Sequence, residues 1–575
     1  MLNALSVFLA DGDRNGEVRA WRSLERQGFF HAKRIEWDGG SVVAWGYPGQ
    51  RQIEDCIVQT PWGTVCCVGP LWFRGYFGRR ALATLLDEVH ATGRLAEDAL
   101  RGNFALFLDT GKHTWLLNDA LGFVRIHASA DGHFFSTSWL ATCAYLQDVK
   151  LDEASAMEYV LLGAAHSCHS VARGVELLPL GQAQDLKRRC TWLRFPDGFD
   201  SRAPNFVSLD EARDAISEHL RKVSTEVALA FPGRVNTALS GGFDSRLIVA
   251  GLLSAGVRPQ LFVYGEADSA DVTIARMVAG ATGLAIGAID KGAMNRRLPE
   301  PDIESLEQSA LFFDGLPSDG IDDPGADRIT RLQQTADGCI ALNGGGGEIF
   351  RNFFHLPGRP FAARDIVRTF YRGFGRGVFR DPGGLTSYEA RLAASIRNIA
   401  GMSAAGGEYL TRAQVELLYP LFRCHYWMGV NNSVAVRHGY YATPLVDLQT
   451  VRLALRVPLC WKNAGALQSY LVAALHPTIA AQPSAYGFGF DVGPGWKARL
   501  AEWTLCARPV RLRPLINATR RTLRNVRVAP AVLQRYRMLL PGEWRMDPLL
   551  DLAQLADDRA LGRALAIEVA WRRIL

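Results

Sequence analysis

The chain has 575 residues, more than one hydrophobic core usually supports, so two or three domains are expected. Its net charge of +6 suits anionic ligands but does not indicate a nucleic-acid partner. Charged residues make up 21% and hydrophobic residues 48% of the chain, as in an ordinary globular protein. The sequence contains no uninterrupted run of about 18 apolar residues, so no membrane span is predicted. The N-terminal apolar run has no basic segment before it, so no signal peptide is predicted and a cytoplasmic location is expected.

The ten cysteines are scattered, without a CxxC pair or a cysteine–histidine cluster at the spacing of a zinc site. Disulfide frameworks belong mainly to short secreted chains, and this chain is long. The pattern therefore predicts buried thiols in a reducing compartment.

Residues 1–195 contain short strand-type runs separated by Gly, Asp and Asn turns, which predicts a β-rich domain. Two prolines in the loop-like segment 195–206 mark a domain boundary. From there on, helical patterns alternate with strand patterns, which is typical of a parallel sheet with crossover helices. The predicted fold class is α/β, with a β-rich domain at 1–195, a parallel α/β domain at 207–500 and an arginine-rich helical extension at 501–575.

The most informative segment is TALSGGFDSRLIVAGLLSAG, residues 237–256, where a strand ends at Leu239 and a helix begins near Asp244. Gly241 and Gly242 lack a Cβ, so the backbone between strand and helix can turn sharply and direct N–H groups at an anion. The segment therefore predicts a phosphate-binding turn.

The polar residues of this segment support that prediction. Ser240 and Ser245 add hydroxyl donors, and the helix start adds the positive end of its dipole. A carboxylate is out of place beside bare phosphate, so Asp244 is expected to bind a Mg²⁺ ion shared with pyrophosphate oxygens. Gly256 is the expected end of the helix. The alternative is a chance strand–turn–helix junction.

A kinase-type phosphate loop needs GxxxxGK[ST], which this turn lacks. The string SGGxDS instead resembles the signature of the ATP pyrophosphatases, which cleave ATP between its α- and β-phosphates. Two further segments follow in the order that this resemblance implies. In residues 260–283 the strand end could line an adenine pocket, although for this segment alone an ordinary strand–helix unit is the favoured interpretation.

The second of these segments is ALNGGGGEIFRNFF, residues 341–354. Its four glycines allow a close backbone approach to a ligand, and Glu348 follows where a second magnesium ligand would be useful. A flexible linker is the alternative. The predicted ATP- and pyrophosphate-binding residues are Leu239, Ser240, Gly241, Gly242, Asp244, Ser245, Arg246, Val263, Tyr264, Gly265, Gly344, Gly345 and Gly346, with Asp244 and Glu348 as metal ligands.

Together these segments resemble the synthetase domain of the asparagine synthetase superfamily, which includes β-lactam synthetases and lasso-peptide macrolactam synthetases. Residues 100–141 and RGVELLPLGQ at 173–182 are similar to the glutaminase half of asparagine synthetases. That glutaminase needs a cysteine directly after the initiator methionine, and Leu2 stands there. The resemblance therefore implies a degenerate glutaminase-like scaffold, and a substrate amine as the nucleophile.

The chain departs from the family pattern at several positions. Relatives carry an acidic GxGxDE where this chain has GGGGE, and an E-x-R motif where YYATPLVD places Tyr440 and Ala442. Ala485 stands where relatives have a lysine. The Tyr/Glu dyad and the lysine of β-lactam synthetases are therefore not carried over. The strings GGGGEIFRNFF and SAYGFGF instead look like lasso-peptide macrolactam synthetases.

The resemblance implies a two-step reaction with Mg²⁺ and ATP. An Asp or Glu side chain of a precursor peptide is adenylated, and the peptide N-terminal amine then closes a macrolactam. A leader-binding protein and a leader peptidase are the implied partners. His438 and Tyr440 are candidates by position for the base that deprotonates the amine, although a structural role for both is favoured. One alternative is a β-lactam synthetase-like or other small-molecule carboxylate–amine ligase. Others are an asparagine synthase-like protein without glutaminase activity and an inactive peptide carrier.

Positions 507–540 hold nine arginines and no acidic residue. A solvated surface is the default interpretation. A nucleic-acid patch is disfavoured because stacking aromatic residues are nearly absent. A docking surface for an acidic precursor or its carrier is the third interpretation, and Arg520, Arg521 and Arg524 are the positions that would test it.

Overall fold

The computed structural model describes residues 1–49, 53–195, 198–199, 205–402, 407–514, 516 and 527–575. No helix in this described part combines the length and apolar character that a membrane crossing requires. All ten cysteines are free thiols. The prediction of buried thiols holds for five of them: Cys56, Cys66, Cys67, Cys143 and Cys424.

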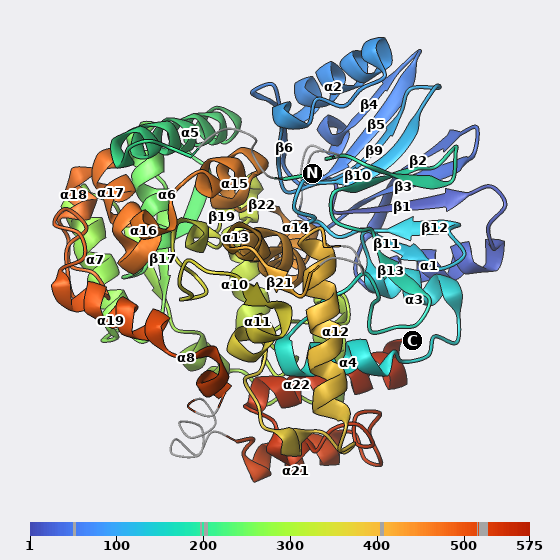
Figure 1. Ribbon diagram of the computed structural model, residues 1–575. Coiled ribbons are helices and arrows are strands. Elements are labelled where there is room, and N and C mark those ends of the chain that lie inside the picture. The colour runs from blue at the N-terminus through green and yellow to red at the C-terminus, as the bar shows by residue number, and fades with distance from the viewer. Residues whose placement is uncertain (50–52, 196–197, 200–204, 403–406, 515, 517–526) are drawn as a thin grey trace.

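The N-terminal part forms two six-stranded antiparallel sheets (Figure 1). The first sheet has the order β13 (Val175–Leu177), β11 (His127–Ser129), β12 (Phe134–Ser136), β1 (Ala4–Leu9), β3 (Gly40–Gly46) and β2 (Phe30–Trp37). The second has the order β15 (Cys190–Leu193), β14 (Gln182–Asp185), β10 (Thr114–Asn118), β9 (Ala105–Asp109), β5 (Gly63–Val68) and β4 (Ile57–Thr60). A small sheet joins β7 (Tyr76–Phe77), β6 (Leu71–Phe73) and β8 (Leu100–Gly102).

Every residue of β1 is buried, because both faces of its sheet are covered. Alternate side chains such as Leu5 and Val7 belong to the core that also holds Phe107 of the second sheet. Ala4 and Phe8 pack on the other face, with residues of α1 (Arg14–Arg26) and α3 (Trp139–Leu146). Helix α2 (Gly78–Thr92) covers the outer face of the second sheet. The result is a four-layered helix–sheet–sheet–helix arrangement.

The following part contains a five-stranded sheet in which every neighbouring pair is parallel. Its order is β18 (Ile286–Ile289), β17 (Gln260–Tyr264), β16 (Val235–Ala238), β19 (Ile340–Leu342) and β22 (Tyr440–Ala442). The register aligns Thr237 with Leu342, and Leu342 with Ala442, so the carboxyl ends of the central strands meet at one edge. Antiparallel sheets followed by a parallel sheet with helices confirm the predicted α/β class.

Three helices frame the central strand β16. They are α5 (Leu209–Ala230), α6 (Phe243–Ser254) and α7 (Ala270–Thr282). Helix α6 starts one residue before the predicted position. It ends ahead of Gly256, whose φ of 77° requires the left-handed region that glycine tolerates, so the predicted helix end is confirmed.

Further helices surround the parallel sheet and connect it to the N-terminal part. Together with α4 (Glu153–Leu162) they are α8 (Lys291–Arg297), α9 (Ile303–Phe312), α10 (Ala326–Gln334), α11 (Ala363–Phe370), α12 (Gly384–Ile399), α13 (Arg412–Leu418), α14 (Gly429–His438), α15 (Leu448–Leu455), α16 (Leu459–Lys462), α17 (Ala466–Leu475), α18 (Pro477–Ala480), α19 (Trp496–Ala507) and α21 (Pro530–Leu539).

The C-terminal helix α22 (Asp558–Val569) is an interior element, and Figure 1 shows it beside α4. Residues 560–569 are all buried. The guanidinium of Arg563 donates to the carbonyl oxygens of Val160, at 2.8 Å, and Ser318, at 3.0 Å. The end of the segment 501–575 therefore ties the antiparallel part to the parallel part.

Candidate functional site

The glycine-rich turn lies at the carboxyl end of β16 and leads directly into α6, with Gly242 as the residue that caps the helix start. The Ser240 amide donates to Ser245 Oγ at 3.0 Å, and the two serine hydroxyls are also 3.0 Å apart. The Gly242 amide donates to Ser240 Oγ at 3.2 Å. Two hydroxyl groups are thus gathered at the positive end of a helix dipole, a favourable place for an anion.

Gly241 sits where two other segments approach the turn closely. Its amide donates to Asp271 Oδ1 at 3.0 Å, and its carbonyl accepts from the Ala485 amide at 3.0 Å. A Cβ at this position would lie 3.0 Å from both Ala485 Cβ and Asp271 Oδ1. The sequence predicts that this amide faces an anion, whereas here it donates to a carboxylate of α7.

The second glycine run packs against the start of α6. A Cβ on Gly344 would lie 3.0 Å from the Ser245 amide nitrogen, and one on Gly347 would lie 2.3 Å from Asp244 Oδ1. The Gly345 amide donates to Asn343 Oδ1 at 2.9 Å, and Gly346 has a left-handed φ of 92°. The absence of side chains on these glycines allows the segment to pack closely against the start of α6. This packing places Glu348 near Asp244.

Asp244 and Glu348 converge on one cation, the side chain of Arg351. Arg351 Nη2 lies 3.2 Å from Asp244 Oδ2 and 3.5 Å from Glu348 Oε1. The Tyr419 hydroxyl donates to Glu348 Oε2. Gln468 Nε2, from α17, donates to Asp244 Oδ1 at 2.6 Å and to the Gly347 carbonyl at 2.8 Å. The two carboxylates predicted from separate motifs are therefore brought together.

Asp244 and Glu348, called the acid pair below, carry more negative charge than the single guanidinium of Arg351 neutralises. Burial, reinforced by the neighbouring Glu348, raises the pKa of Asp244 to about 7 against the opposing effect of Arg351. Burial would lower the pKa of Arg351, but the two acids outweigh it and raise that pKa. A carboxyl group that titrates near neutral pH in this position is typical of a functional site.

The residues present fit a magnesium ion. Among the described residues no three His, Cys, Asp or Glu side chains form a metal-binding group, so any ion here would need further ligands. Mg²⁺ commonly takes one or two carboxylates and completes its shell with phosphate oxygens and water. The Oε1 atom of Gln468 is buried and has no hydrogen-bond partner among the residues that the structure describes. Asp244 and Glu348 would hold the ion, and Gln468 offers one more oxygen.

Arg246 does not face the turn, although the sequence predicts that it binds nucleotide. Its side chain is fully buried and donates to the backbone carbonyls of Gln482 and Pro483. Its guanidinium carbon lies 4.9 Å from the centre of the Phe490 ring. Arg246 therefore fixes the segment that contains Ala485, and its contribution to the site is positional.

The predicted adenine-pocket residues lie at the carboxyl end of β17. Val263 is buried, whereas Tyr264 is 39% exposed, with its ring 4.4 Å from Lys291 Nζ. Gly265 has a φ of 143°, and its amide donates to the Ile289 carbonyl at 3.1 Å. Of the residues Val263, Tyr264 and Gly265, Tyr264 is therefore the one whose side chain a ligand can contact. Leu239, which the sequence also predicts to bind nucleotide, is entirely buried.

His438 and Tyr440 lie away from the acid pair. Tyr440 aligns with Ile340, and Ile340 with Val235, which places it at the amino end of the strands and opposite the turn. His438 stacks on Phe312 at 3.8 Å, and burial lowers its pKa to about 3. Because the two side chains are 2% and 6% exposed, they belong to the core, and the prediction that they act on a substrate amine is corrected.

Four residues of the site were not identified from the sequence: Arg351, Tyr419, Gln468 and Tyr486. Arg351 follows Glu348 by three positions in the same string, and this spacing was an available signal. The Tyr486 ring stacks on Phe243 at 4.3 Å, and its hydroxyl lies 3.5 Å from Arg351 Nη1. Tyr419 and Gln468 come from distant segments, so nothing in the sequence pattern links them to the turn.

The N-terminal part has no nucleophile at position 2. Leu2 is fully buried and forms a bridge to Val68 of β5. The nearby thiols of Cys56 and Cys66 are buried, and burial raises their pKa, that of Cys66 to about 12. These thiols are therefore protonated and weakly nucleophilic at neutral pH.

The chain was compared with protein families, curated proteins and solved structures. No protein-family model and no curated protein matches it. One similar solved structure is glutamine phosphoribosylpyrophosphate amidotransferase from B. subtilis complexed with ADP and GMP, at 11% identity and a TM-score of 0.21. The match covers 50% of this chain and 65% of that chain, just under two thirds of its length. A likeness this weak supports no argument about function.

Proposed function

We propose that this protein is an ATP-dependent, AMP-forming carbon–nitrogen ligase. One observation carries the proposal: the serine-and-glycine turn at the start of α6 lies beside the converging carboxylates of Asp244 and Glu348. The turn offers hydroxyl donors and a helix dipole to phosphate oxygens, and the acids offer ligands to the cation that accompanies ATP.

In the proposed reaction a substrate carboxylate oxygen attacks the α-phosphorus of ATP and expels pyrophosphate. An amine then attacks the acyl carbon, and AMP and a proton leave. When bound, Mg²⁺ would neutralise charge on the departing pyrophosphate. The Ser240 and Ser245 hydroxyls would donate to its oxygens, as would the positive end of α6.

Arg351 supplies the protein cation of this proposal. In the structure its guanidinium neutralises the acid pair and contacts the Tyr486 hydroxyl. If the acids held a divalent ion, the Arg351 guanidinium would be available to bind a phosphate or the adenylate. Relatives place a lysine where this chain has Ala485, and Arg351 reaches the same turn from another segment.

For the substrate, we propose a precursor peptide whose Asp or Glu side chain is joined to its own N-terminal amine, as in lasso-peptide macrolactam synthetases. The strings GGGGEIFRNFF and SAYGFGF and the leucine at position 2 support this choice. A leader-binding protein and a leader peptidase would then be partners. Because Tyr440 is buried at the opposite strand end, the pair of catalytic residues used by β-lactam synthetases has no counterpart at this position.

The alternative is a ligase for a small carboxylate and a small amine. ATP–pyrophosphate exchange separates the two, because exchange requires only the first half-reaction. We expect exchange to depend on a peptide with an internal Asp or Glu, and to be lost in Asp244→Asn. Exchange stimulated by small carboxylates alone would favour the alternative, and wild-type protein without exchange under any condition would contradict the ligase proposal.

A further inference from the structure

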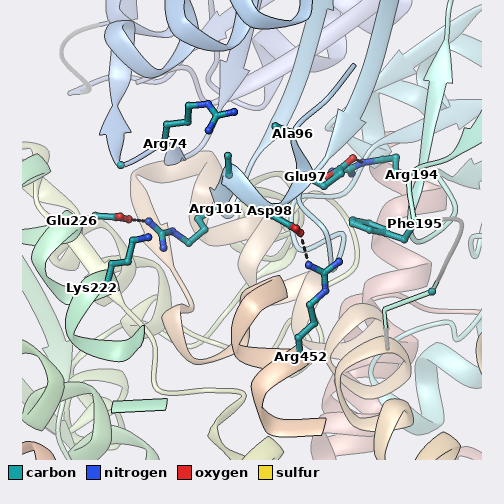
Figure 2. A pocket seen from close by; sticks show the side chains of 13 residues that line it. Arg74, Ala96, Glu97, Asp98, Arg101, Arg194, Phe195, Lys222, Glu226 and Arg452 are labelled. Atoms are coloured by element: carbon teal, nitrogen blue, oxygen red, sulfur yellow. Dashed lines mark hydrogen bonds and ion pairs between the residues drawn. The ribbon is translucent and has the colours of Figure 1, made fainter. Parts of the chain in front are cut away.

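A cavity of about 780 Å³ lies between the antiparallel part and the helices of the parallel part (Figure 2). Its walls come from the segment around β8, from the residues that follow β15, and from α5 and α15. It shares no residue with the turn at Ser240 or with the acid pair. Its volume falls in the range of about 300–1,000 Å³ typical of small-molecule sites.

The lining of this cavity contains five cationic side chains and three carboxylates. Each carboxylate is already paired: Glu97 with Arg194, Glu226 with Arg101, and Asp98 with Arg452. Figure 2 shows these three pairs around the cavity. Among the described lining residues every carboxylate is therefore paired with a cation, and two cations remain.

The two remaining cations are Arg74 and Lys222. Arg74 is held by Glu88, which lies outside the lining, at 2.6 and 2.8 Å. Lys222 is exposed and has neither an ion pair nor a hydrogen bond with any residue that the structure describes. In Figure 2 its side chain points towards the Arg101–Glu226 pair. The cavity therefore contains an ammonium group that no acid in the described structure neutralises.

Two of the paired cations, the buried Arg194 and the half-buried Arg101, are held in place by their acids. The side chain of Arg194 is 1% exposed, and its two nitrogens bind Glu97 at 2.7 and 2.6 Å. The side chain of Arg101 is 13% exposed, and burial lowers its pKa in spite of nearby acids. A bound anion would compensate this poorly solvated charge. Fixed guanidinium groups also lose little conformational freedom on binding.

We propose that this cavity binds a small molecule with two or more negative charges, either a phosphate ester or a polycarboxylate. Guanidinium and ammonium donors match the oxygens of both groups. The Phe195 ring adds an apolar surface to the wall. A role in holding the two parts together explains Arg101–Glu226 and Asp98–Arg452, but it does not explain Lys222, whose charge no described acid pairs.

Titration calorimetry with inorganic pyrophosphate and, separately, citrate at about 0.15 M salt tests the proposal, since screening at that ionic strength suppresses weak surface attraction. We expect saturable binding of at least one probe, weakened about tenfold or more by Lys222→Glu. The milder Lys222→Gln should weaken it less, and both variants should fold because Lys222 is exposed. Pyrophosphate alone would indicate a phosphate ester, and citrate alone a polycarboxylate.

Two controls distinguish this cavity from other anion sites. Lys112→Glu changes another exposed lysine, outside the cavity lining, and should leave binding unchanged. The part of the binding that Lys222→Glu removes should persist in Asp244→Asn, which separates this cavity from the proposed nucleotide site. The proposal is overturned if neither probe binds, or if Lys222→Glu and Lys112→Glu bind equally well.

Discussion

Asp244 and Asp447 are both aspartates at the start of a helix near the carboxyl edge of the parallel sheet, yet their environments differ sharply. Asp447 caps α15, accepting from the Thr450 amide at 2.6 Å, and His219 Nε2 lies 3.1 Å from both of its carboxylate oxygens. Burial would raise the pKa of Asp447, but these partners outweigh it and hold the pKa at about 2. Around Asp244 the balance is reversed, and its pKa is about 7.

The difference separates a carboxylate with a structural role from the one that we propose to be functional. Asp447 has the donors that its ionised form needs, so it stabilises the fold. Asp244 shares its single guanidinium with Glu348, so its ionised form remains short of positive charge. The two carboxylates share one guanidinium, so a further cation can bind between them with favourable electrostatic energy. This supports the proposed role in binding Mg²⁺ with ATP.

Substitution of the acid pair should have the largest effect. We expect Asp244→Asn and Glu348→Gln each to lower ATP–pyrophosphate exchange by about 1,000-fold or more, an order typical for loss of a group that stabilises transition-state charge. Asp302→Asn, at the start of the surface helix α9, is the matched control because asparagine caps helices equally well. Exchange within a few-fold of wild type in both acid variants would contradict the assignment.

Arg351→Gln should have an intermediate effect, a loss of about 100-fold in exchange, because it removes the charge proposed to bind phosphate. It also removes the cation that opposes protonation of Asp244. The pKa of that carboxyl should therefore rise, and the acidic limb of the pH–rate profile should move to higher pH. Arg351→Lys should restore part of both properties. An unshifted profile in Arg351→Gln would show that the guanidinium does not act through Asp244.

Much of this site can be predicted from the sequence. The remaining residues cannot, and the reasons are physical. The turn, the helix 243–254 and the approach of Glu348 all depend on local strings, which predict local structure well. The roles of Gln468 and Tyr419 depend on packing between segments that are far apart in the chain, and the spacing of residues in the sequence does not reveal such contacts. His438 is a candidate only by its position in the sequence, and in the structure it stacks on Phe312 and is buried in the core.

Asp447→Asn should reduce stability and leave the nucleotide site intact. A carboxyl pKa near 2 in the folded state, against about 3.9 when unfolded, corresponds to about 2–3 kcal/mol of unfolding free energy at neutral pH. Because the folded pKa is lowered, this stability is present above pH 4 and is lost as pH falls towards 2. Urea unfolding at pH 7 measures the loss. A variant as stable as wild type at pH 7 would show that the His219 contact contributes nothing.

The smallest predicted effect is a contrast between the two aspartates from pH 5 to pH 8. The folded-state pKa of Asp244 is raised, so the folded protein binds an extra proton between about pH 4 and pH 7 and loses stability as pH rises through that window. Asp244→Asn lacks this loss and should gain about 2 kcal/mol relative to wild type from pH 5 to pH 8. The difference between wild type and Asp447→Asn should stay constant. Parallel curves for all three proteins would refute the contrast.

The central claim is that the turn at Ser240 and the acid pair bind Mg²⁺ with ATP. Calorimetric titration with a magnesium complex of an ATP analogue that resists cleavage between its α- and β-phosphates tests this directly, and it needs no knowledge of the carboxylate substrate. We predict saturable binding at one site, strongly weakened by Ser240→Ala and lost in Asp244→Asn, while Asp447→Asn binds like wild type. No binding to the wild-type protein, or equal binding to wild type and Asp244→Asn, would contradict the account.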